Sequence, residues 1–135
     1  MTRSPNRMLG AIVGAFFVLF GLLGFTVTNG VGFFATEGGL LANLFQLNVF
    51  HNVIHIVIGA ALVLAALSHR AASRAVNAGL GFTFLVLGFA GLLLVGSEFN
   101  ILAINPADNV LHFAAAVVLL VVGIGADSRA SGVSV

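Results

Sequence analysis

Four long apolar stretches separated by short polar segments dominate the pattern of this chain. They run about 8–27, 49–67, 75–95 and 107–125, and each approaches the roughly 20 mostly apolar residues that a helix needs to cross a bilayer. Little sequence lies outside them. The pattern therefore predicts an all-α polytopic membrane protein, with four transmembrane helices in one domain over residues 1–135.

Composition excludes the main alternative classes of protein. The 135 residues are 60% hydrophobic and 7% charged, whereas a soluble domain carries about 25% charged residues. Such a chain cannot cover a water-facing surface, and it is too hydrophobic to be disordered. The few arginines form no clustered basic surface, so no nucleic-acid partner is expected. The lipid bilayer is the expected environment, and a homo-oligomer or a larger membrane complex is the expected assembly.

The distribution of charge predicts an orientation. Four crossings place every arginine on one side of the membrane: Arg3, Arg7, Arg70, Arg74 and Arg129. The two connections on the other side carry Glu37 and Glu98 but no basic residue. Because short basic segments stay in the cytoplasm, we expect a multi-pass plasma-membrane (inner-membrane) protein with both termini cytoplasmic.

The two halves of the chain resemble each other. A shift of 67 positions places Arg7–Thr28 on Arg74–Val95, and a shift of 57 positions places Leu44–Ala66 on Ile101–Gly123. The second shift is smaller than the first because the first outer loop is longer than the second. The match predicts two tandem helical-hairpin repeats, related by a pseudo-twofold axis along the membrane normal.

Matched glycines predict close helix packing. Gly14 and Gly21 are seven residues apart, as are Gly81 and Gly88, so each pair shares one helix face. Small residues let membrane helices approach closely, and we expect the first and third helices to pack on each other. In the first outer loop, apolar residues at helical spacing predict a short interfacial helix over about 39–47.

Two related polar motifs begin the second and fourth stretches, as N-V-F-H-N-V-I-H over 48–55 and N-P-A-D-N-V-L-H over 105–112. Asn48 and Asn105 suit the helix N-cap, where a side-chain oxygen accepts a free backbone N–H. The other polar positions continue a single stripe along each helix: His51, Asn52 and His55 in one, Asp108, Asn109 and His112 in the other. A polar stripe at this depth should face protein or water rather than lipid.

Four interpretations of this cluster stay open. In the first, the His and Asn side chains hydrogen-bond one another and the backbone and lock the second and fourth helices together, as buried polar groups require. In the second, they bind zinc, iron or copper, because imidazole and carboxylate are transition-metal ligands. The ligands would be His51, His55, Asp108 and His112, with Asn52 and Asn109 orienting the rings. In the third, His55 and His112 ligate a haem. In the fourth, the histidines belong to a path for protons or a small solute.

The chain resembles a family of small four-helix actinobacterial membrane proteins, domain of unknown function 4383. The resemblance rests on the number of helices, the arginine-flanked ends and the H-N-x2-H and D-N-x2-H helix starts. The resemblance covers nearly the whole chain and implies a four-helix membrane protein without implying an activity. From the sequence we expect a non-enzymatic structural or accessory subunit, with binding of a metal or haem, or transport, as the alternatives.

Overall fold

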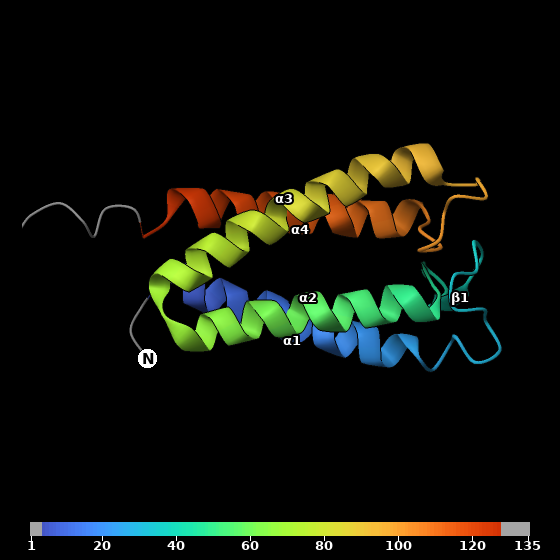
Figure 1. The fold of residues 1–135 in the computed structure, drawn as a ribbon, viewed down its shortest axis with the longest axis horizontal. Coiled ribbons are helices and arrows are strands. Elements are labelled where there is room, and N and C mark those ends of the chain that lie inside the picture. Colours follow the sequence, from blue (N-terminus) through green and yellow to red (C-terminus); the bar gives the residue numbers. More distant parts are fainter. Residues whose placement is uncertain (1–3, 128–135) are drawn as a thin grey trace, which may run out of the picture.

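The computed structural model describes residues 4–127, which form four long helices and one two-stranded β-hairpin (Figure 1). The elements are α1 (Pro5–Gly24), β1 (Gly39–Leu41), β2 (Phe45–Leu47), α2 (Val49–Ser68), α3 (Arg70–Leu94) and α4 (Pro106–Gly125). All four helices are long and apolar enough to span a membrane, with mean hydropathies between 1.9 and 2.1. The expected all-α membrane fold is confirmed. Relative to the sequence prediction, α1 begins and ends three residues earlier and α3 begins five residues earlier.

The helices are arranged as two antiparallel pairs. α1 packs along α2 and α3 packs along α4, while contacts between the pairs are fewer (Figure 1). Buried side chains from all four helices meet between the pairs, where Phe17 and Phe84 stack with ring centroids 4.7 Å apart. Leu62 and Leu119 are fully buried beside them. This apolar core fills the middle of the bundle.

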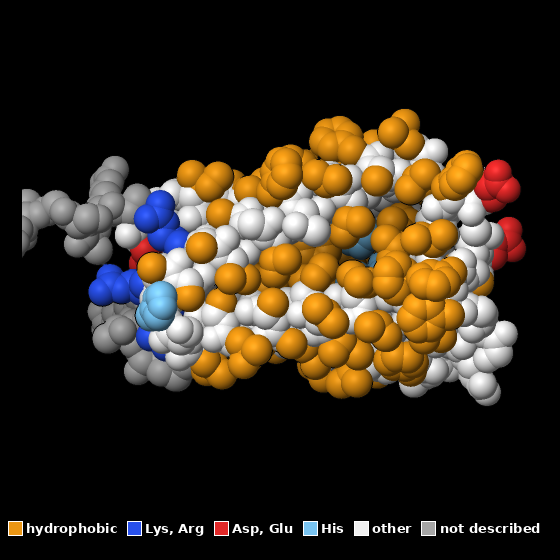
Figure 2. All heavy atoms as spheres, in the orientation of Figure 1, with side chains coloured by type: hydrophobic (Ala, Val, Ile, Leu, Met, Phe, Trp, Pro, Cys, Tyr) orange, Lys and Arg blue, Asp and Glu red, His pale blue; other side chains and the backbone are white. Residues whose placement is uncertain are grey.

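A broad apolar surface surrounds the helices. Figure 2 shows hydrophobic side chains over most of the length, arginines at one end and acidic residues at the other. Leu64, Phe82 and Leu93 are among the large apolar side chains that are more than 60% exposed. Because water disfavours such a surface and lipid does not, the distribution fits a multi-pass membrane protein.

The glycines pack within the helix pairs, which corrects one expectation. A Cβ on Gly14 would lie 2.7 Å from the carbonyl oxygen of Gly59, and one on Gly21 would lie 2.6 Å from the carbonyl oxygen of Asn52. Both neighbours belong to α2. Gly81 and Gly88 in the same way face Leu120 and Phe113 of α4. The glycines are packing residues as predicted, but the expected α1–α3 partnership was wrong.

The segment 39–47 is a β-hairpin, so the predicted interfacial helix was also wrong. β1 pairs antiparallel with β2, in the register Gly39↔Leu47, Leu40↔Gln46 and Leu41↔Phe45. Left-handed backbone at Ala42 (φ 53°) and Asn43 (φ 55°) closes the turn. The leucines have helical spacing, but Gly38 and Gly39 lie so close to the backbone of Leu47 and Val27 that they fix an extended chain.

Hydrogen bonds join the start of α1 to the end of α4. The Ser4 hydroxyl donates to the Asp127 carboxylate at 2.6 Å, and the Asn6 side-chain amide donates to the same group at 3.1 Å. These bonds hold the pKa of Asp127 below its ordinary value. The Asn77 amide of α3 donates to the Asn6 backbone and side-chain oxygens at 2.9 and 3.0 Å. Three helices are thereby tied together at the arginine-bearing end.

Two arginines that the repeat matches make equivalent contacts. The Arg7 Nε donates to the carbonyl of Ala66 near the end of α2, and the Arg74 Nε donates to that of Gly123 near the end of α4. A cation is favourable at a helix C-terminus, where carbonyl groups lack intrahelical partners. These contacts support the repeat, which stays a prediction together with its pseudo-twofold axis.

Candidate functional site

The N-caps of α2 and α4 fix where the polar motifs lie. The Asn48 Oδ1 accepts the backbone N–H of His51 at 2.8 Å, and the Asn105 Oδ1 accepts that of Asp108 at 3.0 Å. In α4 the Asp108 carboxylate also accepts the Asn105 backbone N–H, at 2.9 Å, completing a capping box. Both asparagines therefore serve as the predicted caps.

The same two asparagines tie the outer loops together. The Asn48 amide, at the start of α2, donates to the carbonyl of Ile101 in the loop before α4, at 2.7 Å. The Asn105 amide, at the start of α4, donates to the carbonyl of Leu44 in the hairpin before α2, at 2.8 Å. Each cap thus holds the loop that precedes the other helix. These bonds fix the two helix starts relative to each other.

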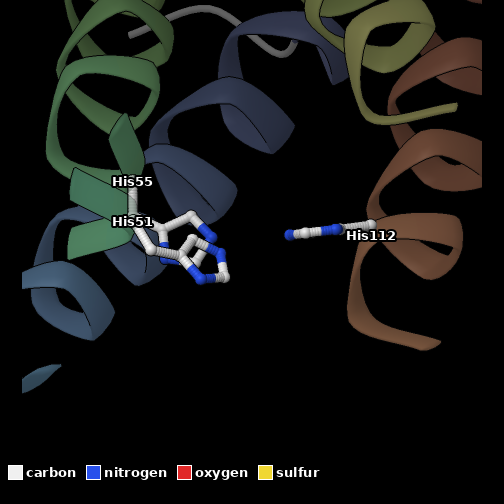
Figure 3. Close-up of side chains that lie close together, drawn as sticks. All are labelled: His51, His55 and His112. Carbon is white, nitrogen blue, oxygen red and sulfur yellow. The ribbon is translucent and has the colours of Figure 1, made fainter. Parts of the chain in front are cut away.

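Three histidines converge just below these caps. His51 and His55 point from α2 toward His112 of α4 (Figure 3). The ring centroids are 4.3 Å apart for His51 and His55, 5.7 Å for His51 and His112, and 5.9 Å for His55 and His112. Each residue offers one nitrogen, and these three nitrogens lie within 4.8 Å of one another. Three possible metal ligands from two helices therefore share one small volume.

Five of the six imidazole nitrogens of this cluster are buried without a hydrogen-bond partner among residues 4–127. Each histidine is only 1% exposed. Both nitrogens of His51, both of His55 and Nδ1 of His112 lack a partner among residues 4–127. The backbone of Gln46 and Leu102 lies near His51. A buried polar group without a partner costs about 1–3 kcal/mol, so the arrangement needs a compensating role.

Aromatic rings surround the histidines. Phe17 and Phe20 of α1 lie with ring centroids 5.2 Å from that of His55, and Phe84 of α3 lies 5.6 Å from His112. These rings offer no strong hydrogen-bond donor or acceptor to an imidazole. No sequence pattern marks these phenylalanines as neighbours of the site, because the apolar helices contain many phenylalanines and only the fold shows which ones contact the histidines.

The remaining candidate residues are placed differently from the histidines. Asp108 lies outside the group of converging ligand atoms, with one carboxylate oxygen used in the capping box and the other buried and unpaired. The Asn52 and Asn109 side chains pack against Gly24 of α1 and Gly91 of α3, and neither amide bonds to an imidazole of the cluster. The Asn52 amide donates to the Thr28 hydroxyl instead, at 3.1 Å. These two side chains pack between the helices of each pair, and in this structure they do not orient the rings.

Comparison with known proteins gives a family but no activity. No curated protein and no solved structure matches the chain. A family model described as "Domain of unknown function (DUF4383)" matches residues 7–125. The match includes all the residues of both polar motifs, and the chain belongs to this family of uncharacterised domains.

Proposed function

We propose that this membrane protein binds a first-row transition-metal ion, such as zinc, iron or copper, through His51, His55 and His112. The observation that carries the proposal is the convergence of three buried imidazoles, five of whose six nitrogens are buried without a partner within residues 4–127. Neutral imidazole suits these metals, and bundles commonly build such sites from side chains on facing helices.

The geometry is close to that of a bound site. A zinc–nitrogen bond is about 2.0–2.1 Å, so nitrogens around one tetrahedral ion lie about 3.4 Å apart. The three ligand atoms lie within 4.8 Å of one another. To bind one ion, the distance between any two of these nitrogens must shorten by at most about 1.4 Å. Small rotations of the side chains supply this change.

The other interpretations have less support. A polar lock requires the side chains to hydrogen-bond one another and the backbone. Asn48, Asn52 and Asn105 make such bonds, whereas five of the six imidazole nitrogens lack them among residues 4–127. A haem needs space between α2 and α4, but stacked Phe17 and Phe84 lie directly against the histidines. A transport path needs polar groups through the bundle, but the middle is filled by buried apolar residues such as Leu62 and Leu119.

We also propose that the site lies at the extracytoplasmic end of α2 and α4 in the plasma membrane. Support comes from the arginines at the opposite end, since basic segments stay in the cytoplasm. The chain contains no cysteine, so single cysteines report sidedness. A cysteine replacing exposed Glu98 should react with an impermeant thiol reagent in intact cells, and one replacing exposed Ala71 should not. The reverse pattern contradicts this orientation.

Zinc should stabilise the protein against unfolding. A ligand that binds only the folded state at 100 times its Kd adds about 2.7 kcal/mol of stability. We expect Zn²⁺ to raise the thermal midpoint of chelator-treated protein in detergent, and the variant H55A/H112A to lose this response. His69 is exposed in the turn between α2 and α3, so H69A is the matched control and should respond like the wild type. A wild-type shift no larger than that of H55A/H112A contradicts the proposal.

A further inference from the structure

We propose that the metal ion held by the three histidines keeps one coordination position open for a small exogenous ligand, and that Asp108 lies beside this position as a hydrogen-bond acceptor. The exogenous ligand is water, which donates to this carboxylate and which a small anion can displace. This inference rests on the proposed metal site and deepens it, because it assigns the site a binding chemistry rather than a purely structural one.

The protein supplies three ligands to the ion. In the described part of the chain, the converging group consists of His51, His55 and His112 and contains no carboxylate. The cap asparagines use their side chains on backbone groups of the helix starts and outer loops. Structural zinc sites are closed by four protein ligands, whereas sites with three protein ligands keep a position for water or substrate. The donor set therefore favours an open position.

The surroundings indicate on which side this position lies. Phe17, Phe20 and Phe84 close the apolar side of the histidines. Asp108 lies on the other side, one helical turn before His112 and therefore on the same face of α4. The polar groups thus lie toward the helix starts, and we place the open position on this side.

Asp108 carries an acceptor that the capping box does not use. Its Oδ2 accepts the Asn105 backbone N–H, while its Oδ1 is buried without a partner among residues 4–127. The residue is 0% exposed. A water molecule bound to a cation is a strengthened hydrogen-bond donor, and a carboxylate also offsets the charge of the cation. A bound ion with a water molecule would satisfy this oxygen and one nitrogen of each histidine.

The test is a Co²⁺ and azide titration of the metal-free protein in detergent. Co²⁺ replaces zinc in such sites, and its visible absorption reports changes in coordination. We expect one Co²⁺ per chain and a saturable change in the spectrum on addition of azide. In the variant D108N the amide oxygen retains the cap on Asn105 while the negative charge is lost. Azide should then half-saturate at a concentration about tenfold lower, because an anion no longer meets the carboxylate.

The outcomes separate this inference from the proposed function. Stoichiometric Co²⁺ with a spectrum that azide leaves unchanged overturns the open position while the metal site stands. An azide response with the same half-saturation in D108N and wild type overturns the role of Asp108. Absence of stoichiometric Co²⁺ binding in the wild type overturns the metal site itself. The wild-type titration decides the open position alone, so that result does not depend on the folding of D108N.

Discussion

Alanine at both Gly14 and Gly59 is expected to destabilise the α1–α2 pair strongly. A Cβ on Gly14 would lie 2.7 Å from the Gly59 carbonyl oxygen, and a Cβ on Gly59 would lie 2.5 Å from the Gly14 carbonyl oxygen. Both contacts are with backbone, so the helices themselves must separate. Overpacking of this kind costs about 1–3 kcal/mol per site, which outweighs the gain of about 1 kcal/mol in helix propensity.

The measurement is unfolding by SDS in mixed micelles, followed by circular dichroism. Gly79 offers a matched control, because a Cβ there meets nothing within 4 Å and the residue is exposed on α3. The variant G79A should be as stable as the wild type or up to about 1 kcal/mol more stable. If G14A/G59A unfolds at the same SDS fraction as G79A, the close α1–α2 contact is contradicted.

Leucine in place of His55 is expected to stabilise the metal-free protein. Both nitrogens of His55 are buried without partners among the described residues, and Phe17 and Phe20 pack against the ring. Removing unsatisfied polar atoms from an apolar setting recovers about 1–3 kcal/mol. A metal site explains why the chain carries a residue that costs stability when the metal is absent. A hydrogen-bonded polar lock predicts the opposite sign, a loss of about 1–3 kcal/mol.

Equilibrium unfolding of chelator-treated protein distinguishes these signs. The control is H69L, which changes an exposed histidine whose Nδ1 accepts the Ala72 backbone N–H at 3.2 Å. Because loss of an N-cap bond costs about 0.5–2 kcal/mol, H69L should be less stable than the wild type, opposite in sign to H55L. In the presence of Zn²⁺ the order should reverse, with the wild type more stable than H55L. A metal-free H55L that is less stable than the metal-free wild type contradicts the account.

The sequence was informative where one local rule decides the structure. Apolar stretches of about 20 residues gave the number and type of the helices. The caps of α2 and α4 were predictable because an asparagine, Asn48 or Asn105, stands just before each apolar stretch. Spacing of four residues placed His51 and His55 on one face of α2, and the matched positions in the two motifs indicated His112 as their partner.

The errors arose where the outcome depends on residues far apart in the chain. Glycine spacing shows that a helix packs closely, but it does not identify the partner: Gly14 of α1 packs against α2 and not against α3. Helical spacing of leucines in 39–47 was overridden by the backbone contacts of Gly38 and Gly39. Asp108 as a metal ligand stays a prediction: it shares a helix face with His112, and a local contact, the capping box with Asn105, uses one of its carboxylate oxygens.

The metal content of the isolated protein tests the central claim most directly. Wild type, H55A/H112A and H69A should be purified in mild detergent, without a chelator and without a histidine tag, and analysed for zinc, iron and copper against protein concentration. We predict close to one ion per chain in the wild type and in H69A, and almost none in H55A/H112A. Wild-type protein without metal, or metal retained equally by H55A/H112A, would contradict a three-histidine metal site.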